Sequence, residues 1–120
     1  MRILLVEDDF MNRELFLDIL EPAGHTIVIE TDGLDGRERA LREPFDLIVL
    51  DIGLPRLSGD AVCRELRAQG VAVPILALSA DALPQQIEER LRAGFDRYLT
   101  KPIAPVALRE AVDELGRARA

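Results

Sequence analysis

The sequence is poor in the residues that build disulfides and zinc sites, because its 120 residues include one cysteine and one histidine. A single cysteine cannot form an internal disulfide, which favours a reducing compartment, and we expect Cys63 to be a small core residue. His25 has no second histidine or cysteine beside it, so the pattern argues against a metal-binding or catalytic role there.

Long hydrophobic runs are also absent. No apolar stretch reaches the roughly 18 residues that a membrane span needs. The first apolar run, Ile3–Val6, is too short for a signal-peptide core, and Glu7, Asp8 and Asp9 follow it immediately. These absences predict a cytoplasmic protein that does not associate with membranes.

Basic residues are in the minority. Lys and Arg total 15 against 22 Asp and Glu, which gives a formal net charge of -7. An acidic chain is a poor match for nucleic acid or for an anionic membrane surface. The charge balance instead suits a protein partner or a bound cation.

No repeat, low-complexity tract or linker rich in Pro, Gly and Ser divides the chain, and 48% of its residues are hydrophobic. This length and composition predict one compact domain with a sizeable core. We expect the domain to occupy residues 1–120, with no output domain and with a frayed tail over Gly116–Ala120.

Strand and helix patterns alternate along the chain. Short apolar runs predict strands at Ile3–Val6, Thr26–Glu30, Asp46–Ile52, Val73–Ser79 and Arg97–Lys101. Apolar residues at helical spacing predict helices from near Phe10, over Gly33–Glu43, after Ser58, from Pro84 and around Leu108–Leu115. The alternation predicts an α/β fold, in which a doubly wound, flavodoxin-like, five-stranded parallel sheet carries five helices on its two faces.

The apolar character of the strands predicts their order. Ile3–Val6, Leu47–Leu50 and Ile75–Leu78 are continuously apolar, which is typical of strands buried on both faces. The segments at 26–30 and 97–101 are more mixed and suit the edges, so we expect the order 2-1-3-4-5. A site then forms beyond the carboxyl ends of the strands, where the order reverses between strands 1 and 3.

Polar side chains gather where four of these strands end. Glu7 and Asp8 follow the first strand, Asp51 the third, Ser79 the fourth and Lys101 the fifth. Two carboxylates 4 Å apart repel by on the order of 4 kcal/mol at an effective dielectric of about 20, and Mg²⁺ offsets such repulsion. The set can stabilise charge on a transferring phosphoryl group, with Asp51 as the nucleophile.

Each of these residues also has an ordinary structural explanation. Asp8 or Asp9 can cap the first helix, and Asp51 can be a turn residue in the segment "DIGLP". Ser79 can be a strand-end hydroxyl and Lys101 a solvated ammonium. The functional hypothesis therefore depends on the joint pattern rather than on any single residue.

The motifs "ILLVEDD", "VLDIGLP", "LSA" and "YLTKP" occur in this order across the chain. With them, the chain resembles the receiver domain of two-component response regulators, the CheY-like family, over essentially its whole length. The stretches "VEDDFMN" and "DIGLPRLSG" are most similar to single-domain cell-cycle regulators and to the receivers of hybrid kinases.

The resemblance implies a phosphorelay signalling switch rather than an enzyme, apart from weak autodephosphorylation. Asp51 would accept a phosphoryl group from a phosphohistidine of a histidine kinase or histidine phosphotransfer protein. Glu7, Asp8, Asp51 and the backbone carbonyl of Gly53 would hold Mg²⁺ as the cofactor. Ser79 stands where threonine is frequent in the family, and Glu7 stands where many members have aspartate.

The resemblance also implies how the switch is transmitted. Lys101 and Ser79 would contact phosphoryl oxygens, and the Lys101–Pro102 peptide bond would be cis. Ser79 and Tyr98 would relay the change to the face made by helix 4, strand 5 and helix 5, where a downstream protein target docks.

The first helix is the expected docking place for the kinase or phosphotransfer protein. There Met11, Leu15 and Phe16 are expected to leave an apolar patch. The implied assembly is a monomer that forms at most a weak dimer on phosphorylation.

Three other hypotheses stay open. A Mg²⁺-dependent phosphatase with an aspartyl-phosphate intermediate usually carries a second Asp two residues after the nucleophile, where this chain has Gly53. A flavodoxin-type nucleotide or flavin module needs a phosphate-cradling first turn, and the acids at 7–9 would repel phosphate. A receiver that is never phosphorylated would act by docking alone.

Overall fold

The computed structural model describes the backbone of residues 1–80 and 83–119, in which five strands alternate with five helices. The strands are β1 (Arg2–Val6), β2 (Thr26–Glu30), β3 (Leu47–Asp51), β4 (Ile75–Ser79) and β5 (Arg97–Thr100). The helices are α1 (Phe10–Leu20), α2 (Gly33–Arg42), α3 (Gly59–Ala68), α4 (Pro84–Ala93) and α5 (Pro105–Arg119).

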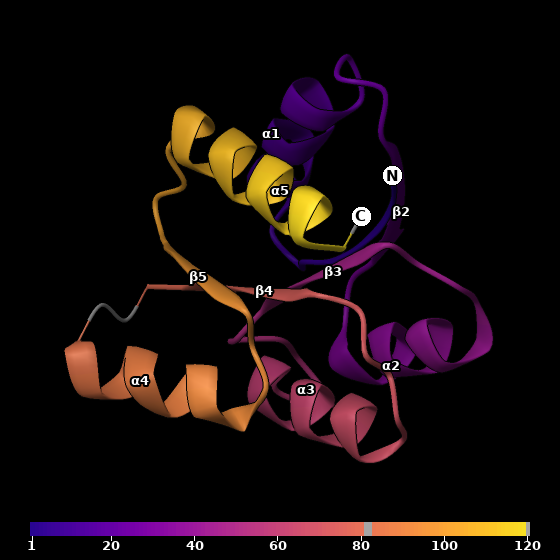
Figure 1. Cartoon of the computed structure of the whole chain (residues 1–120), viewed down its shortest axis with the longest axis vertical. Coiled ribbons are helices and arrows are strands. Elements are labelled where there is room, and N and C mark those ends of the chain that lie inside the picture. Colours follow the sequence, from indigo (N-terminus) through magenta and orange to yellow (C-terminus); the bar gives the residue numbers. More distant parts are fainter. Residues whose placement is uncertain (81–82, 120) are drawn as a thin grey trace.

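All four strand pairings are parallel, and the strand order is β2-β1-β3-β4-β5. The predicted order and the predicted edge strands are therefore confirmed. Figure 1 shows the sheet between two helical layers, with α1 and α5 on one side and α2, α3 and α4 on the other. This arrangement is the doubly wound α/β fold that the alternating pattern predicts.

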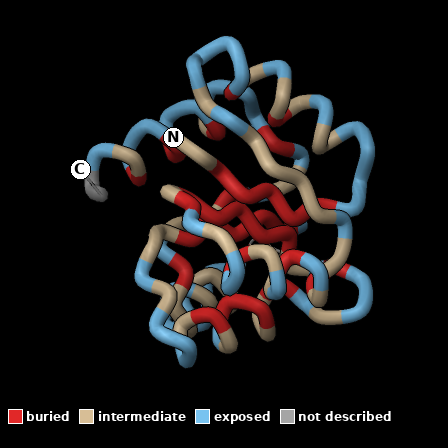
Figure 2. Tube along the Cα trace, turned by 90° about the vertical axis from the view of Figure 1, so that its right-hand side faces the viewer, coloured by how far each residue is buried: buried red, intermediate tan, exposed pale blue. Residues whose placement is uncertain are grey.

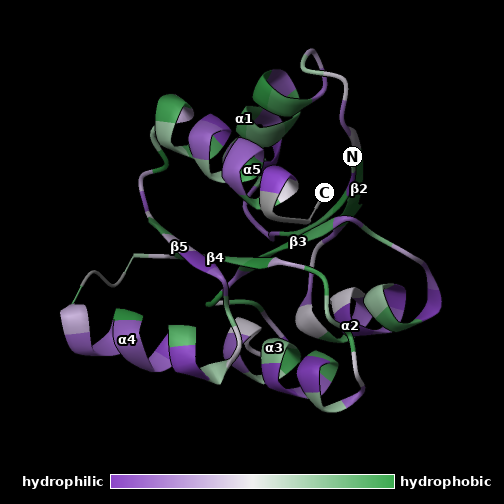
Figure 3. Ribbon diagram, viewed as in Figure 1, coloured by the Kyte–Doolittle hydropathy of each residue, from purple (hydrophilic) through white to green (hydrophobic). Residues whose placement is uncertain are grey.

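The core has one layer on each side of the sheet, because successive strand residues point to opposite faces. Ile3 and Leu5 pack with buried residues of α1 and α5, whereas Leu4 and Val6 pack with those of α2 and α3. The buried strands form the centre of the molecule in Figure 2, and the hydrophobic sides of the helices face them in Figure 3. The sheet thus forms a rigid platform for the loops at its ends.

Local signals place the helix ends close to where the sequence predicts them. Asp9 caps α1 by accepting from the Met11 N–H, and Ser58 caps α3 by accepting from the Ala61 N–H. Pro84 occupies the first turn of α4. β4 begins at Ile75 rather than at residue 73, because Pro74 has no N–H to donate to a strand ladder.

Two expectations are wrong. Gly116 does not begin a frayed tail, because α5 continues to Arg119; Ala120 lies outside the described residues. Leu115 is buried and anchors this last part of the helix against the core. Phe16 is fully buried and adds nothing to the apolar patch expected on α1, whereas Met11 is exposed as expected and Phe10 beside it is also exposed.

The three arginines of α2 do not form one solvated face. Arg37 pairs with Glu65 on α3 at 2.9 Å, and Arg39 pairs with Glu30 on β2 at 2.9 Å. Both side chains are half-buried, whereas Arg42 is exposed.

Within the described residues, no helix combines the length and the apolar character needed to cross a membrane.

Candidate functional site

Four strands deliver polar groups to one edge of the sheet. Glu7 directly follows β1, Asp51 and Ser79 end β3 and β4, and Lys101 directly follows β5. The backbone pairing continues past the strand ends, because the Lys101 N–H donates to the Ser79 carbonyl at 2.8 Å and the Glu7 N–H donates to the Glu30 carbonyl at 3.1 Å. The structure therefore brings the four groups together, as the predicted topology requires.

Three acids form a compact cluster at this edge. One carboxylate oxygen from each of Glu7, Asp8 and Asp51 lies within 4.8 Å of the other two. Glu7 and Asp51 are buried, and Asp8 is exposed. Buried carboxylates at this separation are unfavourable unless a cation lies close by.

Lys101 supplies one such cation. Its Nζ lies 3.1 Å from Oδ2 of Asp51 and 3.4 Å from Oε1 of Glu7. Burial lowers the pKa of Lys101, but the hydrogen bond to Asp51 and the charges of Glu7 and Asp51 outweigh it, so the pKa lies above its ordinary value. Lys101 therefore stays protonated, and it is the only lysine in the chain.

Glu7 remains incompletely satisfied. Burial raises its pKa above the ordinary value; the hydrogen bond from Asn12 and the charge of Lys101 oppose this rise, and the charge of Asp51 adds to it. Oε1 accepts from Nδ2 of Asn12 at 3.0 Å, but Oε2 is buried with no hydrogen-bond partner among the described residues. An orphaned carboxylate oxygen beside two further acids fits a hard divalent cation such as Mg²⁺.

A cavity of about 300 Å³ opens over Asp51, lined by Asp51, Ile52, Gly53, Ser79, Ala80 and Lys101. Two of its walls are small, because position 53 has no side chain and position 80 has only a methyl group. A Cβ built on Gly53 would meet no described atom within 4 Å. The Gly53 N–H donates to Oδ1 of Asp51 at 3.3 Å and so faces the carboxylate.

Tyr98 lies apart from this cavity. It stands on β5, half-buried against the layer that contains α3, and its hydroxyl is buried with no hydrogen-bond partner among the described residues. The guanidinium carbon of Arg90 lies 5.9 Å from the centre of the Tyr98 ring. Of the predicted site residues, Tyr98 is thus the one that the structure leaves outside the cluster.

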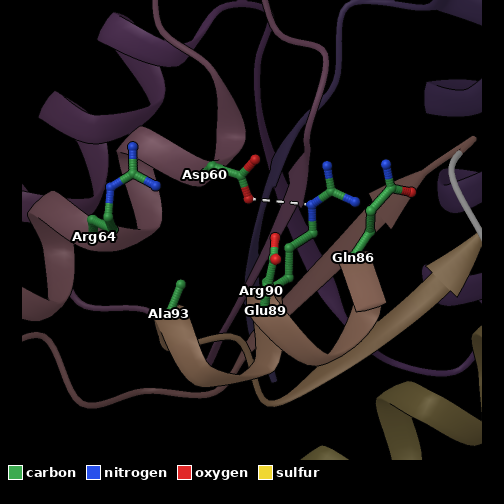
Figure 4. A pocket seen from close by; sticks show the side chains of 6 residues that line it. All are labelled: Asp60, Arg64, Gln86, Glu89, Arg90 and Ala93. Carbon is green, nitrogen blue, oxygen red and sulfur yellow. Dashed lines mark hydrogen bonds and ion pairs between the residues drawn. The ribbon is translucent and has the colours of Figure 1, made fainter. Parts of the chain in front are cut away.

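A second cavity, of about 250 Å³, lies between α3 and α4. Its lining is strongly charged, and Figure 4 shows Nε of Arg90 paired with Oδ1 of Asp60 across it at 3.3 Å. Arg90 therefore contacts both Tyr98 and α3. None of the acidic cluster lines this cavity, so it is separate from the site over Asp51.

The sequence reasoning missed two residues that support the acidic cluster. Asn12 donates to Glu7, and Arg13 donates to the carbonyls of Glu7 at 3.3 Å and of Asp8 at 2.8 Å. Both lie in the first turns of α1, which start directly beyond the acids. The sequence could have indicated both residues by their position, because polar side chains in the first turns of a helix can reach back to the end of the preceding strand.

The Lys101–Pro102 peptide bond at the opposite side of the site is cis.

Known proteins share this sequence pattern and this fold. Residues 3–113 match the family model of the response regulator receiver domain. The chain is 41% identical to the "Response regulator protein PmrA" of Pseudomonas aeruginosa over 98% of its own length and 53% of that protein. It is 37% identical to the "Transcriptional regulatory protein QseB" of Escherichia coli O157:H7, again over 98% of the chain and 53% of the relative.

Solved structures give the same result. The receiver domain of the Francisella response regulator 1452 superposes with a TM-score of 0.95 at 28% identity, covering 99% of this chain and 98% of that one. The receiver domain of the sensor histidine kinase PA1611 of Pseudomonas aeruginosa, solved with a magnesium ion in its active-site cleft, superposes with a TM-score of 0.85 at 36% identity and covers 95% of each chain.

The chain spans about half the length of the curated relatives it matches, and the shared part is the receiver fold. The family match extends from the first strand to the last helix and includes all four strand ends of the cluster. From its sequence and its fold alike, this chain belongs to the response regulator receiver domains of two-component systems.

Proposed function

We propose that this receiver domain is a phosphorelay switch in which Asp51 accepts a phosphoryl group from a phosphohistidine of a histidine kinase or histidine phosphotransfer protein. Response regulators with such domains are phosphorylated by histidine kinases, which supports the class of donor. The observation that carries the proposal is the buried Asp51 carboxylate, which faces the cavity of about 300 Å³ with the Lys101 ammonium 3.1 Å away.

The side chains suit an in-line transfer. A carboxylate oxygen of Asp51 attacks the phosphorus, a P–O bond forms, and the P–N bond to the donor imidazole breaks with its electron pair returning to the ring nitrogen. The ammonium of Lys101 is close enough to pair with the charge that arrives on the phosphoryl oxygens. Ser79 lines the same cavity and brings a hydroxyl to it.

We propose that Glu7, Asp8 and Asp51, with the backbone carbonyl of Gly53, hold Mg²⁺ during this reaction. The bound cation would neutralise negative charge that the acids and the phosphoryl group share. Support comes from the orphaned Oε2 of Glu7 and from the magnesium ion in the cleft of the related PA1611 receiver. The chain's own residues also orient the acids, because Asn12 holds Oε1 of Glu7.

We further propose that Ser79 and Tyr98 relay the phosphorylated state to the surface of α4, β5 and α5, where a downstream protein docks. The two residues stand on neighbouring strands, since Ala77 pairs with Tyr98 and Ser79 pairs with Thr100. The buried hydroxyl of Tyr98 has no hydrogen-bond partner among the described residues, so a second position of the ring that supplies one would be favourable.

Acetyl phosphate tests the phosphoacceptor role without the unidentified kinase. Wild-type protein incubated with Mg²⁺ and acetyl phosphate should gain the mass of one phosphoryl group, as measured on the intact protein. Asp51→Asn should gain none, and Asp46→Asn, an acid at the opposite end of β3, should gain the group like the wild type. Wild-type protein of unchanged mass would refute the proposal.

A phosphatase with the same nucleophile is less well supported. Such enzymes use a second acid two residues after the nucleophile, and here that residue is Gly53, whose open surroundings contain no described atom within 4 Å of its ideal Cβ. Turnover of a small phosphate ester by the purified protein would favour that second function.

A further inference from the structure

The loop that follows Asp51 is held against the start of α2. The Gly33 N–H donates to the Pro55 carbonyl at 3.1 Å, and a Cβ added to Gly33 would lie 1.8 Å from the Leu57 carbonyl oxygen. The backbones approach this closely because residue 33 has no side chain. The segment 52–58 therefore rests directly on the N-terminus of α2.

Arg56, in the middle of this loop, has a backbone conformation that few side chains adopt. Its φ is +69°, and within residues 1–80 and 83–119 it is the only non-glycine residue with a positive φ. A Cβ is crowded in this left-handed region, so glycine or asparagine is the usual occupant. An arginine held there needs a compensating contact.

The guanidinium of Arg56 makes that contact. Its Nη1 lies 3.1 Å from Oδ2 of Asp32 and 3.7 Å from Oδ1 of Asp35. Asp32 is well shielded, with 13% of its side chain exposed, and it also caps α2 by accepting from the Asp35 N–H at 2.8 Å. The ion pair thus joins a strained loop residue to a fixed helix end.

The helix end is itself fixed relative to the acidic cluster. Asp32 follows β2 by two residues, and the last residue of β2, Glu30, accepts from the Glu7 N–H at 3.1 Å. The loop that carries Arg56 directly follows Asp51, and the Gly53 N–H in this loop faces the Asp51 carboxylate. The ion pair between Arg56 and Asp32 therefore adds a side-chain link to the backbone contact between Gly33 and the loop after Asp51.

We propose that Arg56 is a positioning residue for the phosphoacceptor site: its ion pair with Asp32 holds the loop 52–58 so that Asp51 and Gly53 keep their places opposite Glu7 and Asp8. The proposal rests on the function proposed above. It assigns to Arg56 and Asp32 a role in Mg²⁺ affinity and in the rate of phosphorylation, although neither touches the cation or the phosphoryl group.

Two substitutions at position 56 separate positioning from stability. Arg56→Gln removes the charge and keeps the strained backbone, whereas Arg56→Gly removes the charge and relieves the strain. Mg²⁺ affinity is measured by calorimetry, and the free energy of unfolding is measured by urea denaturation in EDTA. Arg42→Gln is the control, because Arg42 is an exposed arginine of the same region that pairs with Glu43 only at 3.8 Å.

Arg56→Gln should weaken Mg²⁺ binding by about two- to fivefold, the range expected when a partly exposed ion pair is lost. Arg56→Gly should weaken Mg²⁺ binding at least as much, and its free energy of unfolding should be no lower than that of Arg56→Gln. Asp32→Asn, which keeps a capping oxygen, should lose the same affinity, and combining it with Arg56→Gln should add little.

The inference would be overturned if both position-56 variants bound Mg²⁺ as tightly as the wild type. It would also be overturned if the losses of Mg²⁺ affinity simply paralleled the losses in the free energy of unfolding. A wild-type protein that neither binds Mg²⁺ nor reacts with acetyl phosphate would instead overturn the proposed function, and the inference with it. The two failures are distinguished by the wild-type measurement alone.

Discussion

The ammonium of Lys101 lies 3.1 Å from Oδ2 of Asp51, which joins the end of β5 to the end of β3 across the intervening β4. The same ammonium lies 3.4 Å from Oε1 of Glu7 beyond β1. One cation thus offsets the charge of two buried acids, and the site depends on it whenever no metal is bound.

Lys101→Ala should destabilise the metal-free protein. The substitution leaves the carboxylates of Glu7 and Asp51 buried without their cation, so we expect the free energy of unfolding to fall by about 1–3 kcal/mol. Urea denaturation in EDTA measures this loss, and saturating Mg²⁺ should recover part of it. Arg109→Ala, which removes an exposed cation from α5, should leave the stability nearly unchanged. Equal stability of Lys101→Ala and the wild type in EDTA would contradict this reading of the site.

Stability should depend on pH through Glu7. Because burial raises the pKa of this carboxyl in the folded state, the folded protein holds the proton more tightly than the unfolded chain does. Without metal, the free energy of unfolding should therefore fall as the pH rises above the ordinary glutamate value of 4.5 towards the raised folded value. Lys101, whose pKa is also raised, stays charged through this window and affects stability only in strongly alkaline solution.

Glu7→Gln isolates this effect. It should raise the metal-free free energy of unfolding at pH 7 by about 1 kcal/mol, flatten its pH dependence, and abolish most of the stabilisation by Mg²⁺. Denaturation curves from pH 4.5 to 8, with and without Mg²⁺, provide the measurement. Glu14→Gln, an exposed acid of α1, should behave like the wild type. A parallel pH dependence in Glu7→Gln and the wild type would show that the burial of Glu7 does not matter.

Two glycines that flank the site should respond in opposite ways to alanine. A Cβ on Gly53 meets no described atom within 4 Å, so Gly53→Ala should fold with unchanged or slightly higher stability, by up to about 1 kcal/mol. A Cβ on Gly59 would lie 2.2 Å from the Asp51 carbonyl oxygen, so Gly59→Ala should lose about 2 kcal/mol or more, within the range for overpacked sites.

Thermal denaturation of the two glycine variants makes the comparison. The wall that Gly53→Ala adds should also slow hydrolysis of the phosphorylated form, which the decay of the phosphorylated mass records. Similar melting temperatures for the two variants would mean that Gly59 does not set the distance between the start of α3 and Asp51.

Cys63 should be unreactive in the folded protein. The thiol is fully buried, and burial raises its pKa from 9.0 to about 11, so almost no thiolate exists near neutral pH. Alkylation by iodoacetamide at pH 8 should be slow for the native protein and complete within minutes in denaturant, as followed by mass. Rapid labelling of the native protein would mean that α3 leaves the core far more often than its packing suggests.

Local patterns were sufficient to predict the strands, their order and most helix ends. Continuous apolar runs such as Leu47–Leu50 identify strands covered on both faces, and Asp9 and Ser58 signal helix starts by chemistry that acts within a few residues. The parallel order then placed Glu7, Asp51 and Lys101 at one edge, because equivalent ends of parallel strands share an edge. This much follows from periodicity and from the handedness of the connections.

Contacts between distant segments required the tertiary structure. Phe16 could equally have faced solvent from α1, and its burial depends on where α5 lies; the persistence of α5 past Gly116 likewise depends on the packing of Leu115. The ion pair between Arg56 and Asp32 cannot be predicted from apolar periodicity or from capping residues. An arginine with a left-handed backbone is favourable only once α2 lies beside the loop. Periodicity and capping chemistry reach only a few residues along the chain, whereas the partner of a long side chain is chosen by how whole helices pack on the sheet.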